Sequence, residues 1–261
     1  MQINLKNKKA LVGGSTSGIG KAIAYQLAES GASVTLMSHN ETKLKKIVAD
    51  LPTDQGQKHQ FLVVDFNDFE GYKNLISAYF ENNSVDILVN NTQGPQAGTA
   101  LQKKIIDYQE AFDLLFKNVV FTTELALRNM QKNKWGRIIN VASVSVREPL
   151  SYLVLSNSIR AAVVTWGKSL SVEVGKDQIT VNSVLTGYFD TQRIADLNAK
   201  KAEESGRTET QILNEMEAKV PVGRIGDPKE YGYLVAFLAS EKAAYITGTQ
   251  IPIDGGLLKS M

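Results

Sequence analysis

A glycine-rich segment, GGSTSGIG at residues 13–20, contains the residue types that a phosphate-binding turn needs. Gly14, Gly18 and Gly20 would let the backbone turn tightly and approach a pyrophosphate, whose charge the free amides of a following helix would bind. A glycine cluster taken alone is more often a tight turn between a strand and a helix. Here an apolar run precedes the glycines and a segment of helical period follows them, which is the setting of a dinucleotide site. We therefore expect this segment to bind a dinucleotide.

Polar residues that end two other apolar runs are candidates for the same site. Asp65 of VVDF and Asn90 of VNNTQG both follow such runs. Each side chain could serve only to end its strand. Ligands of doubly wound sheets, however, bind at the carboxyl ends of the strands, where both residues would lie. This placement favours contact with the cofactor.

Short apolar runs alternate with longer segments of helical period, an order typical of a parallel sheet covered by helices on both faces. The runs are rich in Val, Ile and Leu without regular alternation, as buried parallel strands are. They are KALVGG (9–14), SVTLMS (33–38), QFLVVD (60–65), DILVNN (86–91), GRIINVAS (136–143), ITVNSVL (179–185) and GTQIPI (248–253). Helical periods occupy 21–30 and 104–132, and Asp227 followed by Pro228 predicts the start of a further helix. The pattern predicts one α/β domain over residues 1–261, with a doubly wound parallel sheet of the Rossmann type.

The composition excludes several classes of protein. The chain of 261 residues is 43% hydrophobic and 21% charged, as globular proteins are, and its net charge of +2 comes from lysines scattered among acids. A nucleic-acid partner is therefore not expected. With no cysteine and only two histidines, His39 and His59, we expect neither disulfides nor a metal site. No signal peptide or run of membrane-spanning length is visible, so the expectation is a cytoplasmic protein without a membrane partner.

Three motifs together resemble those of the short-chain dehydrogenases/reductases, and the resemblance runs from about residue 8 to residue 256. The family's Thr-Gly-x-x-x-Gly-x-Gly is present with Gly13 in the threonine place, its NNAG is present as NNTQG at 90–94, and its DGG lies at 254–256. The segments PVGRIGDPKEYGYLVAFLAS and ITGTQIPIDGG look like the C-terminal part of 3-oxoacyl-carrier-protein reductases. The resemblance implies an NADP(H)-dependent oxidoreductase that interconverts a carbonyl and an alcohol. Its partner would be a small carbonyl or alcohol substrate, with acyl thioesters among the candidates.

The resemblance also assigns cofactor contacts. It implies that Asp65 contacts the adenine amino group, that Asn90 lies against the adenosine ribose and that Thr191 holds the nicotinamide carboxamide. The full set of expected cofactor residues is Gly14, Ser15, Ser17, Gly18, Ile19, Gly20, Ser38, His39, Asp65, Phe66, Asn90, Asn91, Arg160, Gly187 and Thr191.

The choice between NADP and NAD depends on the end of the second strand, in LMSHNETK. An acidic residue there would bind the ribose hydroxyls of NAD, and none is present at the strand end. Ser38, His39 and Asn40 could instead donate to a 2'-phosphate. The arginine that usually recognises this phosphate is also missing, and His39 could simply be an exposed residue at a helix start. The sequence favours NADP over NAD.

Two of the family's four catalytic positions are present. Ser143 in INVAS matches the serine that hydrogen-bonds the substrate carbonyl. Asn118 in FKNVVF matches the asparagine that interrupts a long helix and supports a proton-relay water. A strand-end serine bonded to nearby backbone and a surface asparagine on a helix are the alternatives, and the matched framework favours the catalytic roles.

The other two catalytic positions depart from the family. Arg160 in RAAV replaces a lysine, and Ser156 replaces the tyrosine that should stand four residues earlier. In the family, that tyrosine has its pKa lowered by the lysine and protonates the developing alkoxide. A serine hydroxyl is a much weaker acid, and a guanidinium does not exchange protons usefully at neutral pH. Arg160 could still hold the nicotinamide ribose and stabilise an oxyanion. Losing positioned proton transfer alone would slow the reaction roughly 10²- to 10⁴-fold.

Two other phenols are candidate proton donors. On a continuous helix over 151–175, Tyr152 would lie one turn before Ser156, displaced by about 6 Å along the same face. Tyr188 in TGYFD is the other candidate. Their alternatives are a packed aromatic residue at the helix start and a wall of the substrate pocket, and these alternatives are favoured.

The charged segment 191–220 carries intermittent Ile, Leu and Met at helical spacing, which fits a pair of surface helices. In the family, a variable substrate lid occupies this position, so we expect a lid that excludes water. The long helices expected at 104–132 and 151–175 match those that pair subunits in the family. This match implies a homo-oligomer, either a tetramer or a dimer.

Three functions remain open at this stage. The first is the oxidoreductase just described, working with Ser143, Ser156 and Arg160. The second is a catalytically impaired nucleotide-binding sensor or regulator, which the loss of both Tyr and Lys supports. The third is a scaffold subunit, against which the intact glycine segment argues. The surviving nucleotide site and Ser143 place the oxidoreductase first.

Overall fold

One seven-stranded parallel sheet forms the centre of the molecule in the computed structural model, which describes residues 2–260. The strand order is β3-β2-β1-β4-β5-β6-β7. The strands are β1 (Lys9–Gly13), β2 (Ser33–Ser38), β3 (Gln60–Val63), β4 (Ile87–Asn90), β5 (Gly136–Ser143), β6 (Ile179–Thr186) and β7 (Gln250–Ile253). The order reverses between β1 and β4, so the predicted doubly wound Rossmann fold is confirmed.

Helices connect the strands by parallel crossovers. They are α1 (Gly18–Glu29), α2 (Glu41–Asp50), α3 (Phe69–Asn82), α4 (Ile105–Phe112), α5 (Asn118–Asn133), α6 (Val154–Val174), α7 (Gln192–Ser205), α8 (Glu209–Lys219) and α9 (Pro228–Leu238). Short turns of other helix types are the π-helical η1 (Asp113–Lys117) and the 3-10 helices η2 (Val144–Val146), η3 (Gly175–Asp177) and η4 (Glu241–Ala243). Within the described residues, no helix is both long and apolar enough to cross a membrane.

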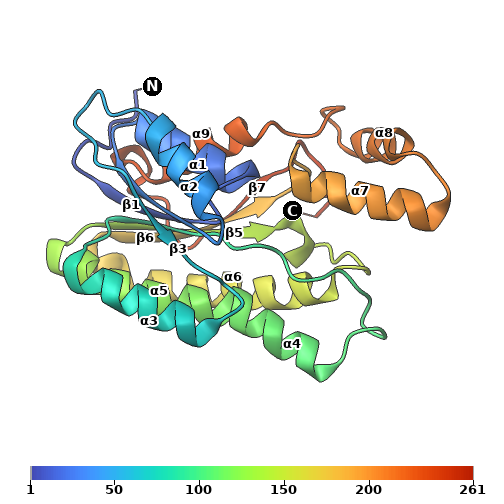
Figure 1. Ribbon diagram of the computed structural model, residues 1–261, viewed down its shortest axis with the longest axis horizontal. Helices are drawn as coiled ribbons and strands as arrows, with labels where there is room; N and C mark the ends of the chain where they lie inside the picture. The colour runs from blue at the N-terminus through green and yellow to red at the C-terminus, as the bar shows by residue number, and fades with distance from the viewer. Residues whose placement is uncertain (1, 261) are drawn as a thin grey trace.

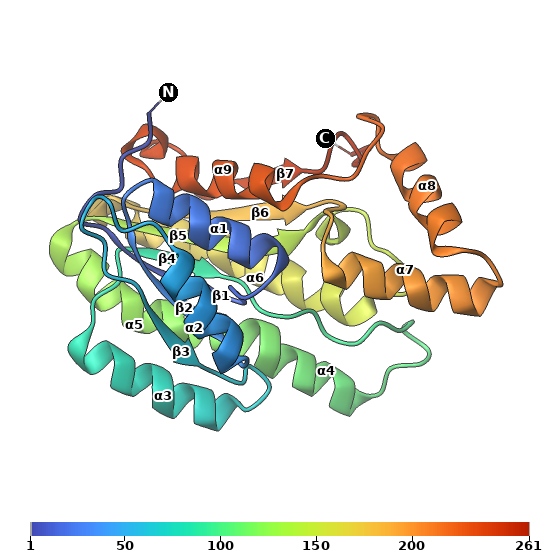
Figure 2. The same cartoon turned by 45° about the horizontal axis from the view of Figure 1, so that its top comes forward.

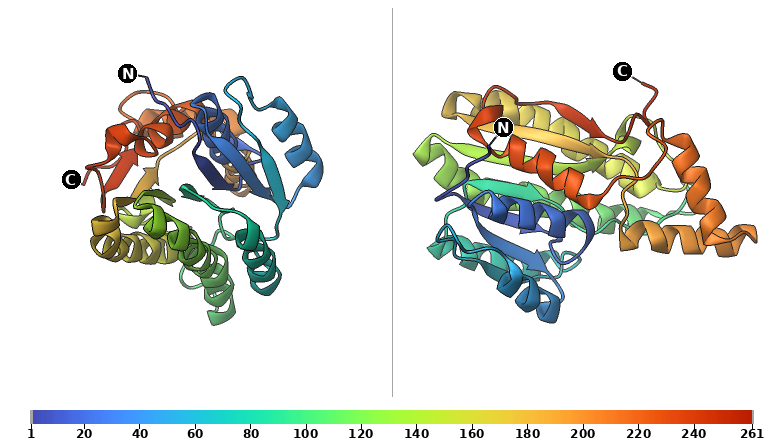
Figure 3. Two further views of the ribbon diagram at one scale, coloured as in Figure 1. Left: turned by 90° about the vertical axis from the view of Figure 1, so that its left-hand side faces the viewer. Right: turned by 90° about the horizontal axis from the view of Figure 1, so that it is seen from above.

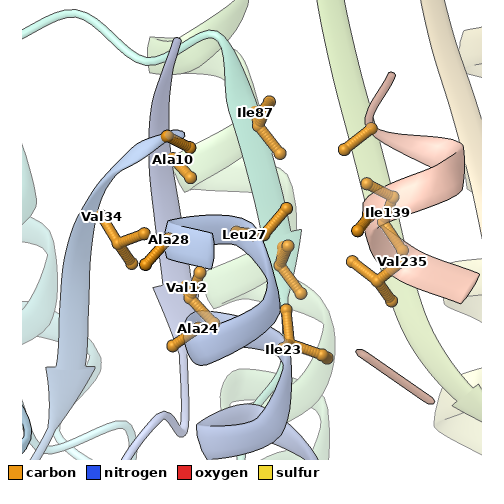
Figure 4. Close-up of a cluster of buried hydrophobic side chains, with 14 of the residues drawn as sticks. Ala10, Val12, Ile23, Ala24, Leu27, Ala28, Val34, Ile87, Ile139 and Val235 are labelled. Carbon is orange, nitrogen blue, oxygen red and sulfur yellow. The ribbon is translucent and has the colours of Figure 1, made fainter. Parts of the chain in front are cut away.

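The sheet separates two hydrophobic cores. Helices α1, α2 and α9 cover one face, and α3, α5 and α6 cover the other (Figure 1). Alternate residues of β1 supply the two cores, because Ala10 and Val12 pack under α1 while Leu11 packs on the opposite side. Figure 4 shows Ile23 and Leu27 of α1 among the residues of the first core. Burial on both faces explains why the strands read as continuous apolar runs.

The predicted strands are confirmed to within two residues at their ends. The third strand ends at Val63 because the carboxylate of Asp65 accepts hydrogen bonds of 2.9 and 3.0 Å from the backbone and side chain of Asn67, which turns the chain. The predicted helix start is also confirmed. Asp227 accepts from the backbone amide of Lys229 at 2.9 Å, and Pro228 is the first residue of α9.

The predicted helix over 151–175 is wrong at its start, since α6 begins at Val154. Gly98 donates to the carbonyl of Tyr152 at 2.7 Å and accepts from the amide of Val154 at 3.3 Å, forming an isolated parallel bridge with Leu153. These bonds hold Tyr152 and Leu153 outside the helix. The expectation that Tyr152 lies one turn before Ser156 on a continuous helix is therefore wrong.

The helix predicted over 104–132 begins at Ile105 and is divided by the π-helical turn η1, so that α5 starts at Asn118. An interruption at Asn118 was the expectation drawn from the family. A π-helical turn inside an α-helix is frequent at functional sites.

The carboxyl ends of the strands lie together at one end of the molecule. Helices α7 and α8 project at this end, and α4 flanks it from the opposite layer (Figures 1 and 2). Seen along the strands, the sheet is enclosed between its two helical layers (Figure 3, left). Ligand sites of open α/β sheets lie at such an end, next to the point where the strand order reverses.

Candidate active site

The glycine turn between β1 and α1 is folded too tightly for side chains at three of its glycines. Gly14 has φ +56°, in the left-handed region that favours glycine. A Cβ atom on Gly20 would collide with the carbonyl oxygen of Gly14, so α1 begins in direct contact with the turn. A Cβ atom on Gly13, in the family's threonine place, would lie equally close to the backbone carbonyl oxygen of Asn91. The missing threonine thus has a local steric reason.

The N-terminus of α1 can receive an anion. Ser17 is exposed at the N-cap with extended backbone, and its hydroxyl accepts no capping hydrogen bond from the described part of the chain. The first turn carries no acidic residue. The amides of Gly18 and Ile19 face the end of the helix, whose dipole favours negative charge. Together with the tight glycine turn, this arrangement fits the pyrophosphate of a dinucleotide.

Two of the expected cofactor residues build the turn with their side chains. The hydroxyl of buried Ser15 accepts from the amide of Met37 at 3.0 Å and donates to its carbonyl at 3.3 Å, which ties the turn to β2. The side-chain amide of Asn91 donates to the carbonyl of Gly13 at 2.9 Å. Their side chains are thus committed to protein partners, leaving their backbone groups as the available cofactor contacts.

At the end of β2, the hydroxyl of Ser38 lies 2.8 Å from that of Thr16. His39 is exposed, and Asn40 caps α2 by accepting from the amide of Lys43 at 2.9 Å. The sequence reasoning missed Thr16, which brings a second hydroxyl to this corner of the site. Its position in the glycine segment, opposite the end of β2, was the available signal.

The side chains that follow β3 and end β4 differ in whether they face solvent or the protein interior. Asp65 is exposed with its carboxylate held by Asn67, whereas Phe66 is buried in the core beneath the sheet. The side-chain amide of Asn90 donates to Thr123 at 3.1 Å and to Asn140 at 2.9 Å, so it is directed into the protein. Of these residues, Asp65 alone presents its side chain to solvent at the strand ends.

Ser143 lies at the end of β5, and Asn118 lies at the start of α5. Ser143 is the last residue of β5, and its half-buried hydroxyl accepts from the amide of Ser145 at 3.1 Å. Asn118 is buried, and its side-chain amide donates to the carbonyl of Phe66 at 2.8 Å. Its Oδ1 atom has no hydrogen-bond partner among residues 2–260. A buried oxygen of this kind needs a donor such as a water molecule.

Arg160 and Ser156 are in contact on one face of α6. The Nε of Arg160 donates to the hydroxyl of Ser156 at 3.3 Å, and one terminal nitrogen donates to the carbonyl of Val141 in β5 at 2.6 Å. The same arginine lines a small cavity with Asn90 and Thr92. Burial lowers the pKa of Arg160 to about 10, and the charge of Arg193 acts in the same direction. The guanidinium therefore remains charged at neutral pH.

Neither candidate phenol is an activated acid. Partial burial raises the pKa of Tyr152, and neighbouring Tyr188 raises it further. Partial burial also raises the pKa of Tyr188. Arg160 does not lower the pKa of either tyrosine. Both tyrosines therefore fit structural roles better than the role of proton donor, and Tyr188 lines a pocket with Phe189 and Gly226.

The segment 191–220 forms two helices, α7 and α8, beyond the strand ends. Thr191 caps α7 by accepting from the amide of Ile194 at 3.4 Å. The methyl group of Thr191 packs at the position where a Cβ on Gly18 would point. Arg193 donates to the carbonyl of Pro95 at 3.0 Å. The start of α7 thus spans the strand ends from the glycine turn to the loop after β4.

Gly187 fixes the start of the segment that leads to α7. Its amide donates to the carbonyl of Ile253 at 3.0 Å, and a Cβ there would lie 2.6 Å from the Cα of Asp254. Only glycine allows this close approach to β7. The sequence reasoning did not identify Arg193, which lies 98 positions from its partner Pro95.

Comparison with known proteins identifies the family. The sequence pattern of a family described as "Enoyl-(Acyl carrier protein) reductase" matches residues 14–258. The 3-oxoacyl-[acyl-carrier-protein] reductase of Aquifex aeolicus is 31% identical over 264 residues, covering 98% of this chain and 100% of the relative. That of Vibrio cholerae is 35% identical over 255 residues, covering 98% and 99%. The chain belongs to the short-chain dehydrogenases/reductases.

Solved structures agree with this assignment. The L-sorbose reductase of Gluconobacter frateurii, complexed with NADPH and L-sorbose, is 28% identical with a TM-score of 0.93 and full coverage of both chains at 100%. YwfH, an NADPH-dependent reductase of bacilysin biosynthesis, is 28% identical with a TM-score of 0.90, covering 97% of this chain and 99% of that protein. The prediction of an NADP(H)-dependent oxidoreductase acting on C=O and CH–OH groups is confirmed. The alternative function, a catalytically impaired nucleotide-binding sensor or regulator, is not favoured.

Proposed function

We propose that this short-chain dehydrogenase/reductase works with Ser143, Ser156 and Arg160 at the end of β5, assisted by Asn118. The observation that carries the proposal is the 3.3 Å contact between the Nε of Arg160 and the hydroxyl of Ser156. The contact places a fixed positive charge and a hydroxyl together on the face of α6 that lies over β5. A site that had lost its function would not need this contact between the guanidinium of Arg160 and the hydroxyl of Ser156.

The cofactor would lie along the strand ends. The amides of Ser17, Gly18 and Ile19 would bind the pyrophosphate, and the hydroxyls of Thr16 and Ser38 would face the 2'-phosphate with His39. Remaining contacts would come from the Asp65 carboxylate, from the backbone at 66 and 90–91, and from Gly187 and Thr191 near the nicotinamide. When bound, NADPH supplies the hydride that adds to the carbonyl carbon. The protein must then stabilise and protonate the oxygen.

Ser143 would hold the substrate oxygen by donating its hydroxyl proton. The guanidinium of Arg160 would stabilise the negative charge that develops on this oxygen, in a site of low dielectric where such charge is most effective. Ser156, held by Arg160, would pass a proton from solvent to the alkoxide. Asn118 would position a water with its unpartnered Oδ1, on the path that refills this proton.

The substrate would be a small carbonyl or alcohol compound. The similarity to 3-oxoacyl-carrier-protein reductases favours an acyl thioester, and the similarity to a sorbose reductase favours a polar ketone. The lid of residues 191–220 would close over either compound and exclude water. Residues 1–261 would act as one domain for binding and catalysis, in the cytoplasm.

We also propose a homo-oligomer, a dimer or tetramer, formed through α4 and α6. Large apolar side chains are exposed on α4, the preceding loop and α6, at Leu101, Ile105, Ile106, Phe112 and Val172. Exposed apolar side chains on neighbouring helices favour an interaction surface here. Light scattering after size exclusion should give at least twice the mass of one chain, and Ile105→Asp together with Ile106→Asp should lower the mass to that of one chain.

A direct test of the proposed function is NADPH oxidation by purified protein with 3-oxoacyl thioesters, ketones and sugars. The proposal expects slow turnover of at least one compound, and a further loss in Arg160→Leu. Steady NADPH binding without oxidation by any compound would contradict it. Retained activity in Arg160→Leu would show that Arg160 has no role in catalysis.

A further inference from the structure

Two arginines at the strand ends form no ion pair with an acid among residues 2–260. Ten ion pairs connect residues of the described chain, and none of them includes Arg160 or Arg193. Asp190 and Asp196, each three residues from Arg193, are the acids nearest to it in sequence, and neither forms any of these pairs. Other arginines of the chain, such as Arg207 and Arg224, do form them. The two guanidiniums thus bring uncompensated positive charge to this end of the sheet.

The loop after β4 contacts Arg193 and lines a small cavity together with Arg160. Thr92 lines the small cavity with Arg160, and Gly94 and Pro95, two and three residues later, lie against Arg193. A Cβ on Gly94 would lie 3.4 Å from a terminal nitrogen of Arg193. The charge of Arg193 lowers the pKa of Arg160, as expected of like charges held near each other. Arg193 therefore reaches from the lid toward the side of the site where the reacting carbonyl would lie.

Arg193 has further N–H groups besides the one that donates to Pro95. One terminal nitrogen donates to the carbonyl of Pro95, a bond that fixes the direction of the side chain. Within the described part of the chain, no acid forms an ion pair with its positive charge. The remaining N–H groups form a planar fork, which matches the two oxygens of a carboxylate. The chain fixes one edge of the guanidinium and leaves the other for a ligand.

We propose that Arg193 is a specificity-determining residue that binds the carboxylate of a keto-acid or hydroxy-acid substrate. This inference rests on the proposed function and names its substrate class. Arg160 would stabilise the oxygen of the reacting carbonyl, while Arg193, on the lid, would bind the carboxylate of the same molecule. Because Arg193 is part of α7, carboxylate binding would also hold the lid over the site.

A phosphate of the cofactor is the other anion within the site. The N-terminus of α1 already provides amides for the pyrophosphate. Thr191, two residues before Arg193, faces that turn, whereas Arg193 is directed to the loop after β4. This division of the lid's first turn assigns the cofactor to the Thr191 side and the substrate to the Arg193 side.

The test compares keto acids with their methyl esters, which keep the carbonyl and remove the charge. The measured quantities are kcat/KM for 2-oxo and 4-oxo acids and esters, and the Kd of NADPH from fluorescence. The wild-type protein should prefer the acids at least tenfold. Arg193→Leu should abolish that preference with an unchanged Kd for NADPH, and Arg193→Lys should restore part of it. Lys200→Leu is the control, since it removes an exposed, ion-paired cation from the same helix.

Two results would overturn the inference while leaving the proposed function intact. One is equal kcat/KM for acids and esters in the wild-type protein. The other is weaker NADPH binding in Arg193→Leu with equal losses for acids and esters, which would assign Arg193 to the cofactor. If no carbonyl compound is reduced, the proposed function fails. Calorimetric binding of acids and esters to the NADP complex then still tests Arg193, and equal affinities would overturn its role.

Discussion

The Nε of Arg160 donates a hydrogen bond of 3.3 Å to the hydroxyl of Ser156, one turn earlier on α6. The same guanidinium is fixed to β5 by its 2.6 Å bond to the carbonyl of Val141. The pair therefore has a defined orientation above the strand that ends in Ser143. In the family, this place is held by a tyrosine and a lysine, whose joint acidity this pair cannot reproduce.

Restoring the family's residues should accelerate reduction. We expect Ser156→Tyr combined with Arg160→Lys to raise kcat by roughly 10²- to 10⁴-fold, the usual contribution of a positioned proton donor. The physical reason is that a lysine ammonium can lower the pKa of an adjacent phenol. Single-turnover oxidation of NADPH with a saturating substrate measures the gain.

Each single variant is the matched control for that experiment. The increase in kcat should be smaller for Ser156→Tyr alone than for the double variant, and Arg160→Lys alone should give no increase in kcat. A double variant that folds and binds NADPH but shows no gain would indicate that the pocket no longer holds a carbonyl in line with this position.

The two tyrosines at the site should be dispensable for proton transfer. Since partial burial raises the pKa of Tyr152 and of Tyr188, neither phenol is a stronger acid than usual. We expect Tyr152→Phe and Tyr188→Phe to keep kcat within about tenfold of the wild type, whereas loss of a general acid typically costs more. A drop of several hundredfold in either variant, with KM unchanged, would identify that tyrosine as the proton donor.

Substitution at the glycine turn should affect stability and cofactor binding together. Gly20→Ala puts a Cβ against the carbonyl of Gly14. We expect a loss of about 1–3 kcal/mol in the free energy of unfolding, typical of overpacking, and weaker NADPH binding because the turn must widen. Thermal unfolding and fluorescence titration measure the two effects.

Gly175→Ala is the control for that substitution. No atom lies within 4 Å of a Cβ at Gly175, and its φ of −58° suits alanine. This variant should match the wild type in melting temperature and in NADPH affinity. Equal behaviour of the two alanine variants would argue against a steric role for Gly20.

Acid should weaken the start of α9. Hydrogen bonds from Arg224 and from the backbone amide of Asp227 lower the pKa of Glu230 from 4.5 to about 2. The folded state thus disfavours protonation, so the stabilisation is complete above pH 4.5 and is lost as the pH falls toward 2. Since the pair is solvent-exposed, the effect on the melting temperature should be a few degrees at most.

Glu230→Gln should therefore have a lower melting temperature than the wild type at pH 7. The difference in melting temperature should shrink as the pH falls from 4.5 toward 2. Glu204→Gln, which removes an exposed ion pair with Lys200 on α7, is the matched control. A difference between wild type and Glu230→Gln that stays constant from pH 7 to pH 3 would show that the carboxylate charge has no such role.

The strands and the glycine turn could be predicted because their signals are local. Buried parallel strands appear as apolar runs, and Asp227 followed by Pro228 marks a helix start within a few residues. The break before α6 could not be predicted, because it depends on pairing between Gly98 and Leu153, distant in sequence.

The candidate site shows the same division. Ser143 and Asn118 followed from motifs, but the sequence does not show that Ser15 and Asn90 direct their side chains into the protein. It also does not show the contact of Arg193 with Pro95, made only when the lid packs against the strand ends. Side-chain direction and long-range pairing depend on the complete fold.

The measurement that tests the central claim most directly follows deuterium from NADPH labelled on the transferable hydrogen of C4 into the product. Wild-type protein should yield an alcohol that carries one deuterium on the former carbonyl carbon, and Arg160→Leu should yield much less. Bound NADPH that keeps its deuterium in the presence of every carbonyl compound tested would contradict the claim that this chain transfers hydride with Ser143, Ser156 and Arg160.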